Sequence, residues 1–393
     1  MGSMPAPDGE PVPPGTRGPM RVLINGVHAK SGGGVTYLRN IIPKLAAMPG
    51  VELHLFLHKD QFDLFYPVSE KVNVTLFSFR STFLHTLSWE QFAIPLHAWA
   101  MGCDVVFSPA NYGPIFGRNH VILLRNAVSV IQLTQNPGSI MYWLAVTGAT
   151  FFSLLTAKKA IAVSHYAKKL LTFGFLKSLG NKCTVVHHGV HPIRTDQMYN
   201  AKLGSDLLAV SDIYIQKNYH TLLQAHALLV KKYPELRLFI VGRDIDRAYT
   251  HELDTLAREL GVEKNVIFKG HVNTTELMKL YKNCRVFVFP SLIETFGNPL
   301  LEAMAIGVPI ASSKEAAMPE VLGDTGSFFD PNDQNDMAEK IEMLLLNSEL
   351  SMTLGKKASQ RARSFNWSDT AQQTYCVLRD AAEPRPETPR RTR

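Results

Sequence analysis

The sequence predicts an α/β protein made of two similar units in tandem, each a parallel sheet covered by helices. Short apolar runs alternate with stretches of helical pattern from Met20 onward, and the same rhythm restarts after residues 187–193. Several of the runs are apolar enough to be buried on both faces. Strands that alternate with helices in this way are typical of parallel α/β sheets. Ligands of such sheets bind beyond the carboxyl ends of the strands, so we expect a site in a cleft between the two units.

The first unit begins with an apolar run, a glycine-rich loop and a helical pattern. Residues 21–27 (RVLINGV) predict a strand, residues 30–34 predict the loop, and residues 35–48 predict a helix. Further strand candidates follow at 51–57, 72–79, 104–109, 120–126 and 159–164.

The second unit repeats the alternation after a linker near residues 189–204, which we take as the domain boundary. Its strand candidates are 206–212, 236–242, 265–270, 284–290 and 307–312. The Pro- and Gly-rich residues 1–19 and the tail 383–393 predict a disordered leader or tag and a disordered tail.

Composition excludes several classes of protein. The 393 residues are 46% hydrophobic and 19% charged, which is typical of a globular chain, and the net charge is +7. That mild excess suits an anionic ligand or an anionic membrane surface, and no pattern indicates nucleic acid. The four cysteines are widely separated, which argues against a disulfide framework or a zinc site and favours the cytoplasm.

A long uncharged stretch, residues 126–157, precedes Lys158 and Lys159. Its length approaches that of a membrane span, but its hydroxyl residues make it only moderately apolar, and a span would separate two strands of one sheet. Two alternatives remain open. One is a core helix, and the other is a helix seated in a membrane interface through residues 138–177.

Two glutamates lie seven residues apart in an otherwise apolar segment, PSLIETFGNPLLEAMAIGVPIA. We expect Glu294 in the loop after a strand, and Glu302 early in a helix with Asn298 as N-cap and Pro299 as first residue. The backbone amides at the helix start suit a phosphate, and the carboxylates suit paired hydroxyls. The plainer alternative is that Glu302 favours the helix dipole and Glu294 is a solvated charge.

These residues resemble the signature of family-four retaining glycosyltransferases. The resemblance is carried by ETFGNPLLEA (294–303) followed by GVP (307–309). Other matching segments are HHGV (187–190), QKNYHTLLQAHALL (216–229), LRLFIVG (236–242), NVIFKGHV (265–272), MPEVLGDTGSFFDP (318–331) and AVS (162–164).

The resemblance implies a GT-B fold, with two Rossmann-like domains at 20–190 and 191–366 and a helix at 367–382 that crosses back to the first domain. Glu302 would bind the ribose and Glu294 the transferred sugar, while Lys217 would neutralise the pyrophosphate. The donor-binding set implied by the motif is completed by Thr295, Phe296, Gly297, Asn298, Leu301 and Val272.

Two positions depart from the family pattern. The family commonly has an arginine five residues before the lysine, where this chain has Asp212, and Arg243 is a candidate substitute. Many members end an N-domain strand with a histidine, where this chain reads Leu124-Arg125-Asn126. We assign Asn126 as a catalytic candidate that hydrogen-bonds a sugar hydroxyl but cannot shuttle protons.

The glycine loop and an acidic pair are further candidates. Gly32, Gly33 and Gly34 let the backbone approach a ligand, so we expect contact with donor phosphate or acceptor, with His28 beside them. The loop lacks the full dinucleotide fingerprint. Asp244 and Asp246 resemble a metal-binding pair, but we interpret them as surface acids and expect no metal.

The sequence therefore predicts a cytoplasmic retaining glycosyltransferase, peripheral to the inner face of the membrane. It would use a UDP- or GDP-sugar donor without a further cofactor, and a glycan or lipid-linked glycan acceptor. The alternative is a non-catalytic nucleotide-sugar-binding subunit or scaffold on the same fold. An epimerase or phosphorylase is a further option.

Overall fold

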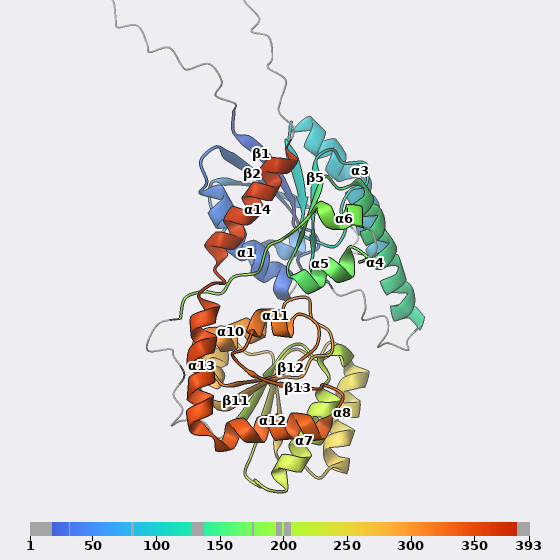
Figure 1. Cartoon of the computed structure of the whole chain (residues 1–393). Helices are drawn as coiled ribbons and strands as arrows, with labels where there is room; N and C mark the ends of the chain where they lie inside the picture. Colours follow the sequence, from blue (N-terminus) through green and yellow to red (C-terminus); the bar gives the residue numbers. More distant parts are fainter. Residues whose placement is uncertain are drawn as a thin grey trace, which may run out of the picture.

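The computed structural model describes residues 18–30, 32–79, 82–126, 137–174, 177–193, 199 and 206–382. The predicted tail lies outside these residues, as do all but the last two residues of the predicted leader. The chain forms two lobes, one above the other in Figure 1, each built on its own parallel sheet. The α/β prediction is confirmed.

The N-terminal lobe holds a seven-stranded sheet in the order β3-β2-β1-β4-β5-β6-β7, and every neighbouring pair is parallel. The register sets Val22 of β1 against Leu53 on one side and Val105 on the other. The strands are β1 Met20–Asn25, β2 Val51–His58, β3 Val72–Phe77, β4 Val105–Ser108, β5 His120–Leu124, β6 Lys159–Ala162 and β7 Cys183–Val185.

The C-terminal lobe holds a six-stranded parallel sheet in the order β10-β9-β8-β11-β12-β13. Both sheets reverse their strand order beside the first strand of the lobe, which is where doubly wound sheets bind ligands. The strands are β8 Asp206–Val210, β9 Leu238–Val241, β10 Val266–Gly270, β11 Cys284–Phe289, β12 Ile310–Ser313 and β13 Ser327–Phe329.

Helices cover both sheets because the central strands are apolar on both faces; all five residues of β5, for example, are buried. The N-lobe helices are α1 Gly32–Ala46, η1 Lys59–Gln61, α2 Phe62–Phe65, α3 Phe83–Ala100, α4 Pro137–Thr156, α5 His165–Leu171 and α6 Lys177–Asn181. The later helices are η4 Ile215–Lys217, α7 Tyr219–Val230, α8 Arg247–Glu259, α9 Thr274–Asn283, α10 Asn298–Ile306, α11 Met318–Leu322, α12 Gln334–Leu346, α13 Ser348–Ala362 and α14 Trp367–Ala381.

The last helix, α14, lies on the N-terminal lobe beside α1 (Figure 1). The hydroxyls of Tyr37 and Thr374 are 3.1 Å apart, and the rings of Tyr37 and Trp367 pack edge to face at 6.3 Å. The chain therefore passes between the lobes twice. The two passages meet where the Val190 amide donates to the Phe365 carbonyl at 2.9 Å.

Helix α10 begins one residue earlier than the sequence predicted. Gly297, not Asn298, is its N-cap, and its φ of +89° lies in the left-handed region that favours glycine. A Cβ there would also lie 3.2 Å from the Phe289 ring. Asn298 is thus the first helical residue, and its side chain is free to contact the other lobe. Gly307 ends the helix as predicted, with φ +86°.

Helix α4 connects β5 to β6, which pair in one parallel sheet. It is long and apolar enough to cross a membrane by length and composition, but its two flanking strands share one sheet. Only Val146, Thr150, Ser153 and Leu154 of its side chains are buried. One side of α4 thus packs on the core of the lobe, together with the partly buried Trp143 and Phe151, and its other side is exposed.

Candidate functional site

The two glutamates lie at the carboxyl end of β11, as predicted. Residues 290–297, which we call the 290–297 loop, lead from β11 to α10 and carry Glu294. The Lys217 ammonium donates a hydrogen bond to Glu294 Oε1, and Ser291 Oγ donates to the same oxygen at 3.4 Å. Both charged side chains are largely buried, 14% exposed for Lys217 and 16% for Glu294. The structure thus brings together two residues that the sequence separates by 77 positions.

Asn218 fixes the position of Lys217, and the sequence analysis did not find it. Its φ of +56° is left-handed, a conformation that asparagine tolerates better than most residues. Its side-chain amide donates to the carbonyl oxygens of Pro331 at 2.7 Å and Pro290 at 3.2 Å. Only its place after Lys217 could have indicated this role.

Glu302 lies in the second turn of α10 and accepts a hydrogen bond from the Tyr281 hydroxyl at 3.2 Å. Burial by the surrounding protein raises the pKa of Glu302 to about 7, while the Tyr281 hydrogen bond opposes that shift. Part of the side chain remains accessible. A carboxyl in this position exchanges its proton near neutral pH and can accept two hydroxyls when ionised.

Arg243 does not stand free as a substitute for the missing arginine, because it pairs with Asp212. Its Nη2 lies 2.6 Å from Asp212 Oδ2, and its Nε and backbone amide both donate to Asp212 Oδ1 at 3.2 and 3.0 Å. Burial alone would raise the pKa of Asp212, but the hydrogen bonds from Arg243 lower it below its usual range. Asp212 therefore neutralises Arg243, the arginine that the sequence offered as a substitute.

The 290–297 loop is also tied to the N-terminal lobe through Thr295. Its hydroxyl donates to the Arg125 carbonyl at 2.5 Å, and its own carbonyl accepts from Ser164 Oγ at 2.6 Å. The sequence predicted Thr295 as a donor ligand, and that role stays a prediction. Its hydroxyl and its backbone carbonyl both already form hydrogen bonds between the lobes.

Glu320 of α11 makes a second connection between the lobes. Its carboxylate accepts from the backbone amides of His165 at 2.8 Å and Tyr166 at 3.1 Å, at the start of α5, and contacts His187 Nε2 at 2.8 Å. Figure 1 shows α11 directly below α5. The segment 318–331 was part of the resemblance, but nothing in it indicated that Glu320 bridges two domains.

Phe296 and Leu301 are core residues, 2% and 1% exposed. The ring of Phe296 lies 5.0 Å from His188, which is also buried, so Phe296 can serve a ligand only through its backbone. Val272 lies in the loop between β10 and α9 and packs partly against the same core.

Asn126 follows β5 with an exposed side chain, and its backbone is held by the buried Asn111. Its neighbour Arg125, which the sequence analysis passed over, turns the other way, toward α1. The guanidinium approaches Gly34 so closely that a Cβ on that glycine would lie 2.7 Å from Nη1 and Nη2. The sequence signal that could have indicated Arg125 is its charge, directly after the apolar strand β5.

Gly32, Gly33 and Gly34 form the first turn of α1 instead of a separate loop. A Cβ on Gly33 would lie 3.3 Å from Asn298 Nδ2, so the beginnings of α1 and α10 meet here. His28 is set apart from them: its Nε2 lies 3.2 Å from the buried Glu90, and its ring packs against Tyr112.

No group of three or more His, Cys, Asp or Glu side chains is placed to hold a metal within the described part of the chain. Asp244 accepts a hydrogen bond from Thr250 at 2.7 Å, and Asp246 caps α8 by accepting from the Tyr249 amide. Both acids therefore accept hydrogen bonds from residues at the start of α8.

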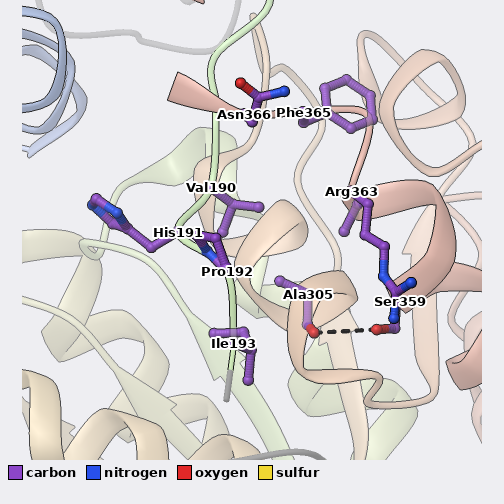
Figure 2. Close-up of a pocket in the computed structure, with 10 residues that line it drawn as sticks. Val190, His191, Pro192, Ile193, Ala305, Ser359, Arg363, Phe365 and Asn366 are labelled. Carbon is purple, nitrogen blue, oxygen red and sulfur yellow. Dashed lines mark hydrogen bonds between the residues drawn. The ribbon is translucent and has the colours of Figure 1, made fainter. Parts of the chain in front are cut away.

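A cavity of about 190 Å³ lies at the hinge, lined by residues of the two passages and of α10 and α13 (Figure 2). Val190, Pro192 and Phe365 are among its walls, and none of the predicted site residues lines it. The convergent polar groups, and not this cavity, mark the candidate site.

Comparisons with known proteins agree with this arrangement. The family model "Glycosyl transferases group 1" matches residues 201–361, which is most of the C-terminal lobe and less than half of the chain. An O-antigen chain mannosyltransferase B from Escherichia coli is 32% identical over 183 residues, covering 45% of this chain and 46% of the relative. The chain spans less than half the length of the curated relatives it matches.

Solved structures extend the likeness to both lobes. Sucrose-phosphate synthase from Thermosynechococcus elongatus superposes with a TM-score of 0.74 at 21% identity, over 92% of this chain and 98% of that one. Anabaena HepE in complex with UDP and glucose gives 0.72 at 17% identity, over 92% and 100%. The fold is GT-B: two parallel-sheet α/β domains facing each other.

Proposed function

We propose that this protein is a retaining glycosyltransferase of family four, which moves a sugar from a UDP- or GDP-sugar to a glycan or lipid-linked glycan acceptor. The observation that carries the proposal is that Lys217 pairs with Glu294 in the loop leading into α10, while Glu302 lies on α10 itself, all inside the segment that the glycosyltransferase family model matches. No further cofactor is proposed.

The roles follow from the chemistry of the leaving group. When the bond from the anomeric carbon to the diphosphate breaks, negative charge develops on the departing oxygen. Lys217 and the amides at the start of α10 would stabilise that charge, since a fixed cation and a helix N-terminus need no reorganisation as the reaction proceeds.

Glu302 and Glu294 would hold the two sugars of the donor. Ionised Glu302 would accept hydrogen bonds from the ribose hydroxyls, and Glu294 would accept one from the transferred sugar. Glu294 already accepts from Lys217, so a donor that draws Lys217 toward its phosphate would free an oxygen of Glu294 for the sugar. Asn126 would contact the transferred sugar from the N-terminal lobe.

The comparisons support a nucleotide-linked hexose as donor. HepE was solved with UDP and glucose, and with UDP-glucose, and the Escherichia coli relative transfers mannose by its name. The test is to incubate the protein with UDP-glucose, UDP-galactose and GDP-mannose and to follow release of the nucleoside diphosphate. Proton NMR of the glycosylated product would report the anomeric configuration.

We expect release from one of these donors and the same anomeric configuration in donor and product. An inverted product would contradict the retaining mechanism alone. Tight donor binding without release, with a range of glycan acceptors, would favour the non-catalytic subunit instead.

We further propose that the protein acts in the cytoplasm, on the inner face of the membrane. One side of α4 presents Met141, Leu144, Phe152 and Leu155, at helical spacing and between 49% and 68% exposed, with Tyr142 beside them. Helix α3 adds a second stripe, Phe92, Leu96 and Trp99, of which Trp99 is 81% exposed. In the view of Figure 1 both helices are drawn along the same edge of the lobe.

Helices α3 and α4 are both anchored to the loop that carries Gly113. Gln91 of α3 donates to the Gly113 carbonyl at 3.2 Å, and Ser153 of α4 donates to the same carbonyl at 3.1 Å. Lysines 158, 168, 169 and 177 follow α4, at least partly exposed. An apolar stripe flanked by lysines suits an anionic bilayer surface.

Vesicle sedimentation tests this part. Trp99→Ser combined with Phe152→Ser should reduce binding to vesicles that contain phosphatidylglycerol at least ~10-fold, since each buried aromatic contributes about 1.5–3 kcal/mol. Leu346→Ser, at an equally exposed position of the other lobe, is the matched control. Equal binding by the double variant and the control would contradict the membrane proposal and leave the transferase proposal intact.

A further inference from the structure

We propose that Arg125 of the N-terminal lobe binds the diphosphate of the nucleotide-sugar donor, and adds positive charge to a site whose C-terminal cations, Lys217 and Arg243, are already paired with carboxylates. This inference rests on the proposed function. It assigns a residue that neither the motif nor the matched family model, which covers residues 201–361, includes.

The first observation is that, among the described residues, only the Nε atom of the Arg125 guanidinium has a hydrogen-bond acceptor. Its Nε donates to the Pro109 carbonyl at 2.9 Å, and its backbone amide donates to Asn111 Oδ1 at 2.9 Å. Its Nη1 and Nη2 donate to no acceptor among the described residues, and no described carboxylate pairs with it. A guanidinium whose two terminal nitrogens can both donate suits an oxyanion that accepts two hydrogen bonds.

The second observation is the place of that fork. Nη1 and Nη2 both lie against Gly34 in the first turn of α1. The Arg125 carbonyl is bonded to Thr295, three residues before Asn298. The guanidinium therefore lies where the beginnings of α1 and α10 meet, beside the amides that a phosphate of the donor would use.

One further donor, the side-chain amide of Asn298, borders the same spot. Asn298 Oδ1 lies 2.8 Å from His188 Nδ1, and burial lowers the pKa of His188 to about 4, so this ring is neutral at physiological pH and donates from Nδ1. That contact directs Asn298 Nδ2 toward Gly33, where it finds no acceptor among the described residues. A neutral amide donor and a cationic guanidinium are thus both placed at the first turn of α1.

The third observation is the charge balance of the opposite side. Lys217 is paired with Glu294, Arg243 is paired with Asp212, and Glu302 adds a further carboxyl. Together these groups carry no net positive charge, whereas a nucleoside diphosphate is strongly anionic. A donor that met only these groups would find little electrostatic attraction.

Burial makes the free charge costly in the empty protein. It lowers the pKa of Arg125 to about 10, which still leaves the guanidinium protonated at neutral pH. A partly buried cation without a counter-ion destabilises the fold, and binding of an anion relieves that cost. The site is therefore built for an anionic ligand and not for the stability of the unliganded lobe.

Titration calorimetry with UDP and GDP tests the proposal, on the full chain as wild type, Arg125→Met, Arg125→Lys and Arg237→Gln. Arg237 is the matched control, since it pairs with Asp206 on an exposed surface. We expect Arg125→Met to weaken binding of the preferred nucleoside diphosphate by ~10- to 100-fold, Arg125→Lys to keep part of the affinity, and the control to match wild type.

Thermal unfolding without ligand separates this role from a structural one. The midpoint of Arg125→Met should equal or exceed that of wild type, because a costly charge is removed; a midpoint well below wild type would assign Arg125 to the fold and overturn the proposal. Unchanged UDP and GDP affinity in Arg125→Met would also overturn it, and would leave the proposed function standing. Failure of the wild type to bind either nucleotide, or any nucleotide sugar, would remove the proposed function and this inference together.

Discussion

The two lobes bring different electrostatics to their shared boundary. In the C-terminal lobe the two cations of the candidate site are matched by carboxylates, Lys217 by Glu294 and Arg243 by Asp212. In the N-terminal lobe Arg125 faces the same region without a carboxylate partner among the described residues. We infer that one lobe is balanced for selecting the sugar and nucleotide, and that the other adds attraction for the diphosphate.

Hydrogen bonds also join the two lobes. Thr295 and Glu320 of the C-terminal lobe bond to backbone groups of the other lobe, so the 290–297 loop and its contacts between the lobes belong to one network. A change in lobe orientation would therefore move the loop that carries Glu294. The predictions below test this division of labour, from the largest expected effect to the smallest.

Glu294→Gln should have the largest effect. The variant keeps the shape but loses the charge that holds Lys217 and accepts from the sugar, and we expect turnover to fall ~10²- to 10³-fold. Affinity for the free nucleoside diphosphate should not fall, because the substitution frees Lys217 for the phosphate. Donor-release kinetics and calorimetry measure the two quantities; a large loss of nucleotide affinity with normal turnover would contradict the assignment.

Glu302→Gln should act on the affinity for the nucleoside diphosphate. Without an ionised carboxylate the ribose loses its acceptor, so affinity for the nucleoside diphosphate should fall ~10-fold at pH 8. The same loss should shrink as the pH falls below 7, because the wild-type carboxyl is then protonated as well. Equal ratios of wild-type and variant affinity at pH 6 and pH 8 would exclude Glu302 as the titrating ligand.

Stability should respond to Glu302 with a defined sign. Its pKa is raised from 4.5 to about 7, so the folded protein binds one more proton than the unfolded chain between these values, and its stability falls as the pH rises through that window. The loss is at most about 3 kcal/mol, less for a partly accessible group. Glu302→Gln should therefore unfold at a higher temperature than wild type at pH 8 and at a similar temperature near pH 4.5.

Glu320 provides the opposite sign as a control. Burial raises its pKa, but the hydrogen bonds from His187 and the backbone amides of His165 and Tyr166 outweigh this and lower it. Its contribution is present above its unfolded pKa and is lost as the pH falls. Glu320→Gln should lose stability at pH 7, and a gain there would show that the contacts between the lobes are misassigned.

Asp212→Asn should have the smallest effect and sharpens the comparison of the lobes. The substitution frees Arg243, and affinity for UDP or GDP should rise ~3- to 10-fold at low salt. Asp206→Asn, which frees the exposed Arg237 in the same way, is the control and should leave affinity unchanged. No gain in the first variant would mean that Arg243 lies out of reach of the donor.

Local signals in the sequence placed Glu294 and Glu302 on the elements where the structure has them. A strand that ends at Pro290, a proline at the start of α10 and Gly307 at its end put Glu294 and Glu302 on known elements. The N-cap was placed one residue late, because the left-handed Gly297 takes that position. Glycine has no side chain that could form a capping hydrogen bond, so the sequence pattern favoured Asn298 as the N-cap.

Long-range pairing was beyond reach of the sequence. Asp212 and Arg243 follow neighbouring strands, and their pairing depends on the register of β8 and β9. The choice of Asn126 over Arg125 failed to anticipate that Arg125 turns toward Gly34. For α4 the absence of charged residues left no face distinguishable from another, so only the packing shows which of its side chains are buried.

The central claim is that the donor lies across the start of α10, with its ribose on Glu302 and its diphosphate near Lys217 and Arg125. A crystal structure of the protein grown with the nucleotide sugar that binds best tests it most directly. We predict density for the diphosphate between the beginnings of α1 and α10, with Lys217 and Arg125 in hydrogen-bond distance of its oxygens. A donor bound in the hinge cavity beside Val190 and Phe365, with no contact to Glu302, Lys217 or Arg125, would contradict the account.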